Sequence, residues 1–244
     1  MTNKIHNSDC LLGMKQHLSD SSIDFIMTSP PYDNLRKYEG YDFDFKNIAA
    51  ELFRVIKQGG VMVWVVGDSV INGSESGTSF KQALYFKELG FNLHDTMIYE
   101  KNSSTYPASS ISNRYTQIFE YMFILSKGKP TTHNLIQDKP NKWAGHSSYD
   151  GKVAKVQDMG VRTNIWRYIT SKDTHGGHPA VFPEDMARDH ILTWTNEGDI
   201  VLDPFMGSGT TAWIAVMTNR KYVGFEISKN YCNMAEQRLG LYAN

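Results

Sequence analysis

The sequence predicts an α/β fold that is built around a doubly wound, mostly parallel sheet. Three observations lead to this prediction. Apolar runs of strand length alternate with segments of helical period along most of the 244 residues. The run from Val61 to Val66 is apolar without a break, as in a strand that is covered on both faces. Glycines end several of these segments. Alternating strands and helices of this kind form a largely parallel sheet with helices on both faces.

The N-terminal half contributes strands and helices in alternation. Strands are expected over residues 4–9, 23–29, 61–66, 93–99 and 118–125, and helices over 11–17, 45–57 and 80–89. The segment 45–57 has apolar residues at Ile48, Leu52 and Val55, a spacing that places them on the same face of a helix. We expect Gly59-Gly60 to stop this helix and Gly90 to stop the next one.

The C-terminal part repeats the alternation around a glycine-rich turn. A strand is expected over 199–202, a helix over 210–218, a strand over 221–226 and a last helix over 230–239. Three stretches, 33–44, 101–116 and 129–175, show no clear period. We therefore expect one domain formed by residues 1–128 and 176–244, with a small insertion at 129–175.

The composition is that of an ordinary globular protein, with 41% hydrophobic and 21% charged residues. No apolar run approaches the ~20 residues that a membrane helix needs, and the N-terminus lacks a signal-peptide core. These features predict a cytoplasmic protein with no membrane association. Cys10 and Cys232 are far apart and belong to no metal-ligand spacing, which argues against a disulfide framework and a zinc site. We expect both to be ordinary buried residues.

The net charge of −1 does not indicate nucleic-acid binding, so any basic surface must be local. The insertion at 129–175 holds eight Lys or Arg and four Asp, a net charge of +4, with Trp143, Tyr149, Trp166 and Tyr168 among them. Basic residues interleaved with aromatic ones suit nucleic acid. A solvated loop region would explain the charges equally well.

The first chemical motif is Thr28-Ser29-Pro30-Pro31-Tyr32, which follows an apolar run at 23–27. Two adjacent prolines have no N–H groups and leave neighbouring carbonyls free to accept hydrogen bonds from outside the chain. The serine hydroxyl is a further acceptor, and the tyrosine ring is a flat stacking surface. Together they suit a planar heterocycle with an exocyclic amine. The alternative is a strand that ends in a proline-rich turn.

The second motif runs from Asp203 to Thr211, with the sequence Asp-Pro-Phe-Met-Gly-Ser-Gly-Thr-Thr, between an expected strand and an expected helix. Glycines let the backbone approach a ligand, and a helix N-terminus offers free N–H groups. The dinucleotide and triphosphate loop patterns are absent, while Glu226 follows at a position that commonly holds ribose hydroxyls. A ligand with adenosine and no pyrophosphate fits, and S-adenosylmethionine is such a ligand. The alternative is a purely structural strand, turn and helix.

Both motifs, in this order, resemble those of the β-class amino DNA methyltransferases, which modify cytosine N4 or adenine N6. The resemblance covers nearly the whole chain. It implies a seven-stranded Rossmann-like methyltransferase sheet that is circularly permuted, with residues 129–175 as a target-recognition region. It also implies S-adenosyl-L-methionine as cofactor and double-stranded DNA as partner. A cognate restriction enzyme and the choice between monomer and homodimer are left open.

The resemblance implies roles for particular residues. The catalytic residues would be Ser29, Pro30, Pro31 and Tyr32. The cofactor-binding residues would be Asp9, Cys10, Thr28, His178, Pro179, Phe182, Asp203, Pro204, Phe205, Gly207, Ser208, Gly209, Thr210, Thr211 and Glu226. Candidate DNA contacts are Arg36, Lys37, Lys142, Lys152, Lys155 and Arg162. No metal is expected, although His175, His178, Asp185 and His190 are close in sequence, because their spacings match no standard site.

The implied reaction is direct methyl transfer to the amine of a base that is flipped out of the duplex. Ser29 favours cytosine N4 as the acceptor, because family members with Ser at this position usually modify that atom, and adenine N6 is the alternative. Methylation at cytosine C5 needs a Pro-Cys nucleophile, and neither cysteine follows a proline. Similar motifs occur in enzymes that methylate RNA or a protein glutamine amide. A cofactor-binding module without activity is the non-enzymatic alternative.

Overall fold

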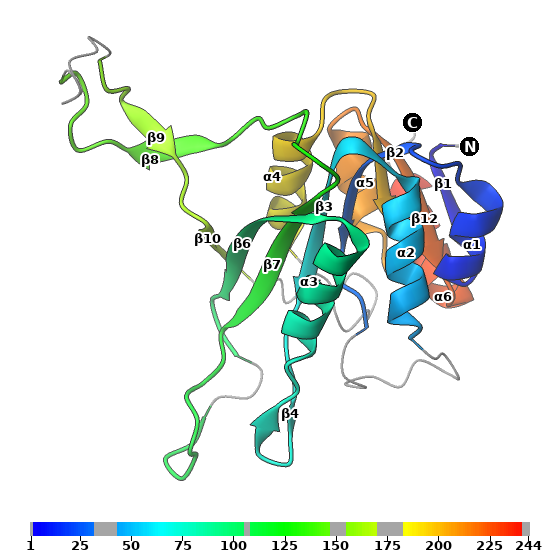
Figure 1. Cartoon of the computed structure of the whole chain (residues 1–244), viewed down its shortest axis with the longest axis horizontal. Coiled ribbons are helices and arrows are strands. Elements are labelled where there is room, and N and C mark those ends of the chain that lie inside the picture. Colours follow the sequence, from blue (N-terminus) through cyan, green and yellow to red (C-terminus); the bar gives the residue numbers. More distant parts are fainter. Residues whose placement is uncertain (1, 32–42, 105–107, 147–154, 170–182, 241–244) are drawn as a thin grey trace.

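The computed structural model describes residues 2–31, 43–104, 108–146, 155–169 and 183–240. Their centre is an eight-stranded sheet with the order β1-β12-β11-β2-β3-β7-β6-β10 (Figure 1). The bounds of its strands are β1 (Lys4–Asn7), β2 (Ile23–Thr28), β3 (Ile56–Val66), β6 (Asn92–Lys101), β7 (Phe119–Ser126), β10 (Ile165–Tyr168), β11 (Ile200–Asp203) and β12 (Lys221–Glu226). Strand β7 pairs antiparallel with both neighbours, whereas the other neighbours pair in parallel. The predicted α/β class with a mostly parallel sheet is therefore confirmed.

The expected number of seven strands is wrong, because the sheet has eight. The extra strand, β10, comes from within the stretch expected to be an insertion and pairs with β6 at the edge of the sheet. It is only four residues long and alternates between exposed and buried side chains, with Trp166 and Tyr168 facing inward. So short a half-buried edge strand, bordered by charges, carries too weak a period to be recognised in the sequence.

Helices cover both faces of the sheet (Figure 1). One face is covered by α1 (Cys10–His17), α2 (Phe45–Val55) and α3 (Thr78–Leu89), and the other by α4 (Glu184–Trp194), α5 (Thr210–Met217) and α6 (Lys229–Gly240). The two cores follow the alternation of the strands: in β3, Met62 and Trp64 pack on the side of α2 and α3, and Val61 and Val63 on the opposite side. No helix in the described ranges is long and apolar enough to cross a membrane.

Gly59-Gly60 does not stop the helix as expected. Helix α2 ends at Val55, and β3 begins at the next residue, so both glycines lie inside a strand. The pairing of β2 with β3 shifts register at this point, and Gly59 has φ +80°. A Cβ at Gly60 would lie 2.9 Å from the carbonyl oxygen of Asp24. The glycines therefore allow an irregular, close strand pairing and do not act as a helix stop.

Two small hairpins project from the sheet at opposite ends of its strands (Figure 1). The first consists of β4 (Val70–Ile71) and β5 (Ser74–Glu75) and follows the carboxyl end of β3. The second consists of β8 (Gln137–Pro140) and β9 (Met159–Val161) and follows the end of β7. Because β7 runs antiparallel to β3, the second hairpin leaves the sheet at the amino ends of the parallel strands, which we call the amino edge. We call residues 137–161 the arm.

Candidate active site

Four neighbouring parallel strands bring the predicted chemical segments to one edge of the sheet. The strands are β1, β12, β11 and β2, in this order. Their carboxyl ends carry the segment at Asn7, the acid Glu226, the loop after Asp203 and the motif that begins at Thr28. Ligands of open α/β sheets bind outside this edge. Segments separated by up to about 200 residues in the sequence thus meet in one place.

A buried carboxylate joins the two motifs. The Thr28 hydroxyl donates to Asp203 Oδ1 over 2.7 Å, and the Thr211 hydroxyl donates to Asp203 Oδ2 over 2.7 Å. The Phe205 backbone N–H also donates to Oδ1, over 3.0 Å. The Asp203 side chain is 2% exposed, and this burial raises its pKa to about 6. Since Ser29 directly follows Thr28, these hydrogen bonds fix the first motif relative to the loop after Asp203.

The loop between β11 and α5 owes its shape to two glycines with positive φ. Gly207 has φ +52°, and Gly209, the N-cap of α5, has φ +83°. A Cβ at Gly209 would lie 2.8 Å from the Cβ of Ala235 in α6, so this position has neither the conformation nor the space for a side chain. The Met206 N–H donates to the Phe225 carbonyl over 2.9 Å and draws the loop over the end of β12.

Glu226 is oriented by the same loop. Its Oε2 accepts from the Gly207 N–H over 2.8 Å, and its Oε1 accepts from the Ser228 N–H over 2.8 Å. Burial of this carboxyl raises its pKa. The Ile227 N–H also interacts with this carboxylate, so three backbone donors leave one of its four lone pairs for a ligand. The expectation from the sequence, that Glu226 holds ribose hydroxyls, stays a prediction.

The end of β1 lies against Glu226. Asn7 Nδ2 donates to the Glu226 carbonyl over 3.0 Å, and the Ser8 N–H donates to it over 3.1 Å. The Ser8 hydroxyl is buried with no hydrogen-bond partner in the described part of the chain, and it lies against α1, where a Cβ at Gly13 would be 2.8 Å from it. Asp9 caps α1 by accepting from the Leu12 N–H over 3.0 Å, and Cys10 is buried as the first residue of that helix.

Sequence reasoning missed one residue that supports the cofactor loop. Arg238 in α6 donates to the Thr210 hydroxyl over 3.1 Å and forms an ion pair with Glu184 at the start of α4. It also donates to the Ser208 carbonyl over 3.5 Å. Arg238 therefore ties the loop to two helices. No sequence signal could have found it, because the contact depends on how α6 packs.

Some predicted site residues lie outside the described residues: Tyr32, Arg36, Lys37, Lys152, His178, Pro179 and Phe182. Among the described ones, Ser29 is half-buried and Pro30 is buried at the end of β2. Lys142 and Lys155 are exposed on the arm, at the edge opposite to Ser29. Their expected role as DNA contacts stays a prediction.

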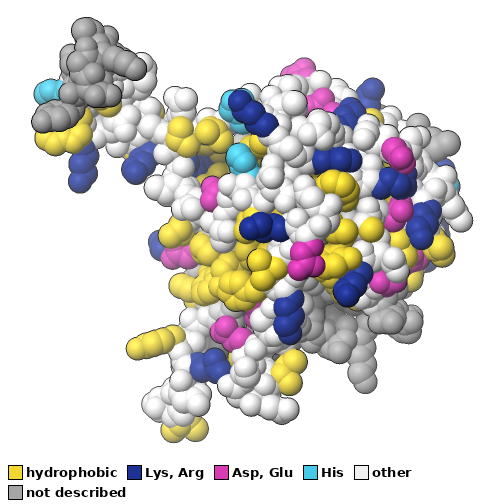
Figure 2. Space-filling view, viewed as in Figure 1, with side chains coloured by type: hydrophobic (Ala, Val, Ile, Leu, Met, Phe, Trp, Pro, Cys, Tyr) yellow, Lys and Arg dark blue, Asp and Glu magenta, His cyan; other side chains and the backbone are white. Residues whose placement is uncertain are grey.

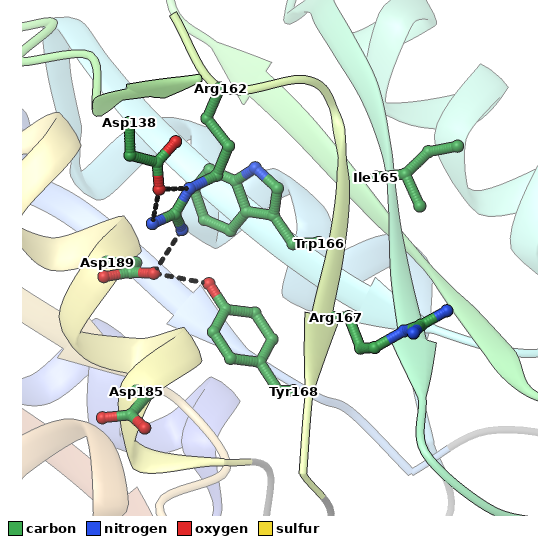
Figure 3. A pocket seen from close by; sticks show the side chains of 8 residues that line it. All are labelled: Asp138, Arg162, Ile165, Trp166, Arg167, Tyr168, Asp185 and Asp189. Carbon is green, nitrogen blue, oxygen red and sulfur yellow. Dashed lines mark hydrogen bonds and ion pairs between the residues drawn. The ribbon is translucent and has the colours of Figure 1, made fainter. Parts of the chain in front are cut away.

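A pocket of about 440 Å³ lies between β10 and α4, away from the edge that carries Ser29 (Figure 3). Arg162, a candidate DNA contact, forms ion pairs there with Asp138 and with Asp189, the latter over 2.6 Å. Tyr168 donates to Asp189 over 2.7 Å, and the Arg162 guanidinium lies 5.1 Å from the centre of the Trp166 ring. Since β3, β7 and β6 separate β10 from β2, this pocket belongs to a different part of the molecule.

Asp68, which follows the end of β3, and His190 both have structural surroundings. Asp68 accepts from the Ser79 N–H over 3.0 Å and from the Ser76 hydroxyl over 2.9 Å, so it serves as a turn and cap residue. His190 is fully buried, which lowers its pKa to about 3, and its ring stacks on Trp166 with 4.6 Å between centres. Within the described ranges, no group of three or more His, Cys, Asp or Glu side chains could hold a metal ion.

Comparison with known proteins agrees with this geometry. The family described as DNA methylase matches residues 23–237. The orphan methyltransferase M.BamHII of Bacillus amyloliquefaciens is 56% identical over 249 residues, which cover 94% of this chain and 93% of that protein. The structure titled PvuII DNA methyltransferase (cytosine-N4-specific) has a TM-score of 0.76 at 20% identity and covers 98% of this chain and 86% of its own. A structure of M1.HpyAVI in complex with SAM has a TM-score of 0.66 at 26% identity and covers 97% of this chain and 98% of its own.

The family match spans both chemical motifs, and the loop, the glycines and Glu226 suit the cofactor that the complex contains. The chain therefore belongs to the N6/N4 amino DNA methyltransferase family, and its cofactor is S-adenosylmethionine.

Proposed function

We propose that this protein transfers a methyl group to the exocyclic N4 amine of a cytosine within a specific site of double-stranded DNA. The observation that carries the proposal is the clamp at Asp203, which accepts from Thr28 on one side and from Thr211 on the other. It holds the strand that presents Ser29 beside the loop that suits the cofactor. Donor and acceptor loops are thus fixed relative to each other, and positioning supplies much of the rate in a direct transfer.

The residues of the first motif would bind and orient the base. We infer that Tyr32 stacks on the flipped base, while the Ser29 hydroxyl and the Pro30 carbonyl accept hydrogen bonds from its amine. These bonds would localise the nitrogen lone pair and aim it at the methyl donor. S-adenosylmethionine, when bound, supplies an electrophilic methyl group on a sulfonium. The chain need not form a covalent intermediate in this reaction.

The choice of cytosine N4 rests on Ser29, as the family resemblance indicates, and adenine N6 is the second candidate. A hydroxyl and a carboxylate can both accept from either amine, so the chemistry of the acceptor does not decide between the bases. We also propose the permuted order of the family for this chain. It is supported by β2 and β11, which lie side by side although 175 residues separate Thr28 from Asp203.

We propose that residues 129–175 contribute to recognition of the DNA, with Lys142, Lys152, Lys155 and Arg162 as contacts. The net charge of +4 in this stretch supports the proposal. Arg36 and Lys37, which follow the first motif, are proposed to contact phosphate near the target base. Whether a restriction enzyme accompanies the protein follows from its genomic neighbourhood and not from the site.

The test is incubation with S-adenosylmethionine and mixed-sequence duplex DNA, followed by digestion to nucleosides and mass spectrometry. N4-methylcytosine is the expected product. N6-methyladenine would keep the mechanism and overturn the choice of base. If the protein bound S-adenosylmethionine and yet methylated neither base in any duplex, the proposed function would be wrong.

A further inference from the structure

Two loops project together beyond the edge of the sheet that carries Ser29. One is the β4–β5 hairpin after β3, and the other is the segment 108–116 between β6 and β7 (Figure 1). Strands β2, β3 and β6 all point their carboxyl ends to this edge, because β3 pairs in parallel with β2 and β7 reverses direction between β3 and β6. We call the two loops the edge loops. Anything that presents a base to Ser29 must pass close to them.

The edge loops are built as one structure. In the hairpin, Asn72 and Gly73 both have positive φ, as the tight turn between its two short strands requires. The base of the hairpin is fixed where Ser76 and Ser79 bond to Asp68. Arg114 of the second loop donates to the Gly73 carbonyl at the tip of the hairpin. The two loops are therefore linked to each other at the tip of the hairpin, far from where they leave the sheet.

The second loop is also held by its own hydrogen bonds. The Ala108 N–H donates to the Thr116 hydroxyl over 2.8 Å, and the Ser109 N–H donates to the Ser112 hydroxyl over 2.9 Å. Its apolar side chains nevertheless point to solvent: Tyr115 is 100% exposed and Ile111 is 93% exposed. On the hairpin, Val70 and Ile71 are about half exposed. Hydrophobic side chains are visible at this lower end of the molecule in Figure 2.

The composition of the edge loops suits the edges of bases in duplex DNA. Residues 102–118 contain no Asp or Glu, and they offer Ser, Thr, Asn and Gln side chains together with Arg114. Nearby carboxylates are neutralised or engaged: Glu120 pairs with Lys101, and Asp68 accepts from Ser76 and Ser79. Glu75 is the exposed carboxylate of the hairpin, and a carboxylate can accept from the N4 amine of a cytosine.

We propose that the edge loops enter the major groove of the duplex beside the target base and determine part of the sequence specificity. The major groove is about 12 Å wide and admits a two-stranded ribbon. Ile71 and Ile111 would contact thymine methyl groups or similar apolar edges, and Tyr115 would stack at the gap that the flipped base leaves. Arg114 has five N–H donors, so its bond to Gly73 leaves others for the DNA. This inference rests on the proposed function, and it identifies residues that would determine the DNA sequence specificity of the methyl transfer.

The arm at the opposite edge makes the inference testable by comparison. Trp143 on the arm is 69% exposed and lies far from Ser29 along the strand direction, whereas Tyr115 lies at the same edge as Ser29. Substituting either exposed aromatic residue with Ala removes little intramolecular packing. Met217→Ala is a control for removal of an exposed apolar side chain, because Met217 is 55% exposed at the end of α5 away from this edge.

The experiment uses the full chain and a short duplex that extends one helical turn beyond the methylated site on each side. Tyr115→Ala and the double variant Ile71→Ala with Ile111→Ala are expected to raise KM for this duplex by about 5- to 150-fold, which corresponds to the ~1–3 kcal/mol of one stacking or base-edge contact. The affinity for S-adenosylmethionine should not change. Sequencing of methylated sites in mixed-sequence DNA should show relaxed preference at one or more base pairs.

The inference fails if these variants match Met217→Ala in KM and in site preference, or if Trp143→Ala relaxes the preference instead. Binding of the short duplex by fluorescence anisotropy is the second measurement, and it does not depend on methyl transfer. If the parent protein binds the duplex through Tyr115 and methylates no DNA, the proposed function is wrong while the edge loops remain a DNA-binding surface. If it methylates DNA and Tyr115→Ala has no effect in either assay, only the edge-loop inference is wrong.

Discussion

At the scale of single residues, Asp203 joins the two motifs through hydrogen bonds within the protein. The sequence predicts it as a cofactor-binding residue at the start of the glycine-rich motif. The structure engages both carboxylate oxygens with Thr28, Thr211 and the Phe205 N–H. The residue therefore positions the two loops and adds a buried negative charge between them. Such a charge is costly when ionised, and this explains why burial raises its pKa.

This pKa predicts a pH-dependent stability difference between the parent and Asp203→Asn. The folded-state pKa of Asp203, about 6, lies above its ordinary value of 3.8. Its titration therefore favours the folded parent below pH 4, and this contribution is lost as the pH rises through 6. The free energy of unfolding of the parent minus that of Asp203→Asn should fall by on the order of 3 kcal/mol over this range and stay flat above it.

Chemical denaturation between pH 4 and pH 8 measures this difference. Asp199→Asn is the matched control, because the Asp199 carboxylate also accepts a backbone N–H, from Asn196 over 2.7 Å, but at the surface. If the difference between the parent and Asp203→Asn rises with pH, or does not vary, Asp203 is not the buried ionisable clamp that the structure shows.

Ser29 gives the second prediction at this scale. Ser29→Ala removes one proposed acceptor for the target amine, and the loss of a hydrogen bond in the transition state costs about 1–3 kcal/mol. We expect kcat to fall by about 5- to 150-fold at saturating S-adenosylmethionine. The dissociation constant of the cofactor, measured by calorimetry, should stay the same.

Ser22→Ala is the control for this substitution, because the Ser22 hydroxyl donates to the Ser19 carbonyl in a turn before β2, at the amino edge. An unchanged kcat for Ser29→Ala would remove this hydroxyl from the mechanism. A weakened affinity for S-adenosylmethionine would instead assign Ser29 to the cofactor site.

At the scale of elements, the cofactor loop depends on α6. Arg238 reaches from α6 to the Thr210 hydroxyl, the Ser208 carbonyl and the carboxylate of Glu184. The guanidinium is only 11% exposed, so its removal would leave Glu184 without its partner and the loop without its tether. We expect Arg238→Ala to raise KM for S-adenosylmethionine by about tenfold, with a smaller change in kcat at saturation.

Arg188→Ala is the matched control, because Arg188 forms an exposed ion pair with Asp185 on α4, and such pairs contribute little. Steady-state kinetics with varied S-adenosylmethionine measures both variants. Equal effects of the two substitutions would mean that Arg238 is an ordinary surface cation.

The elements also show what sequence could predict. Strands β2, β11 and β12 were predictable because they are apolar runs that end at Pro, Gly or an acidic residue, and the glycines before α5 mark its start. Helix α4 was not predicted, and β10 is too short to show a period. The stop at Gly59-Gly60 was misplaced because glycines that relieve a crowded strand pairing look the same in sequence as glycines that end a helix.

At the scale of the whole molecule, the sheet separates two surfaces that the sequence places in one region. The stretch 129–175 contains both β10, which completes the sheet, and the arm, which leaves it. Sequence composition could not show that the arm departs from the edge opposite to Ser29, because this follows from the reversed direction of β7. The meeting of the two motifs, in contrast, could be predicted from the sequence, because each follows a strand and adjacent parallel strands end at the same edge of the sheet.

This separation predicts that most of the arm can be removed. Neither buried core cluster contains a residue from the described ranges 141–146 and 155–158, and the arm meets the body at its base, where Asp138 pairs with Arg162. Replacing residues 141–158 by an Asn-Gly turn keeps the end of the pairing, Pro140 opposite Met159, within reach of a tight turn. We expect the thermal midpoint to shift by no more than about 2 °C, and the affinity for S-adenosylmethionine to stay unchanged.

The effect of this replacement on DNA should depend on the length of the duplex. Strand β7, which leads from the edge that carries Ser29 toward the arm, has 8 residues and so spans roughly 26 Å, which places the base of the arm about that far away along the strand direction. We therefore expect Lys142 and Lys155 to contact phosphates only of a duplex that extends well past the site. KM for a short duplex should match that of the parent. KM for a long duplex should rise, and its dependence on salt should weaken by up to ~0.9 in slope for each phosphate that the protein no longer neutralises. An equal rise in KM on short and long duplexes would instead indicate that the arm contacts the DNA next to the target base. Sequence recognition would then be assigned to the arm and not to the edge loops.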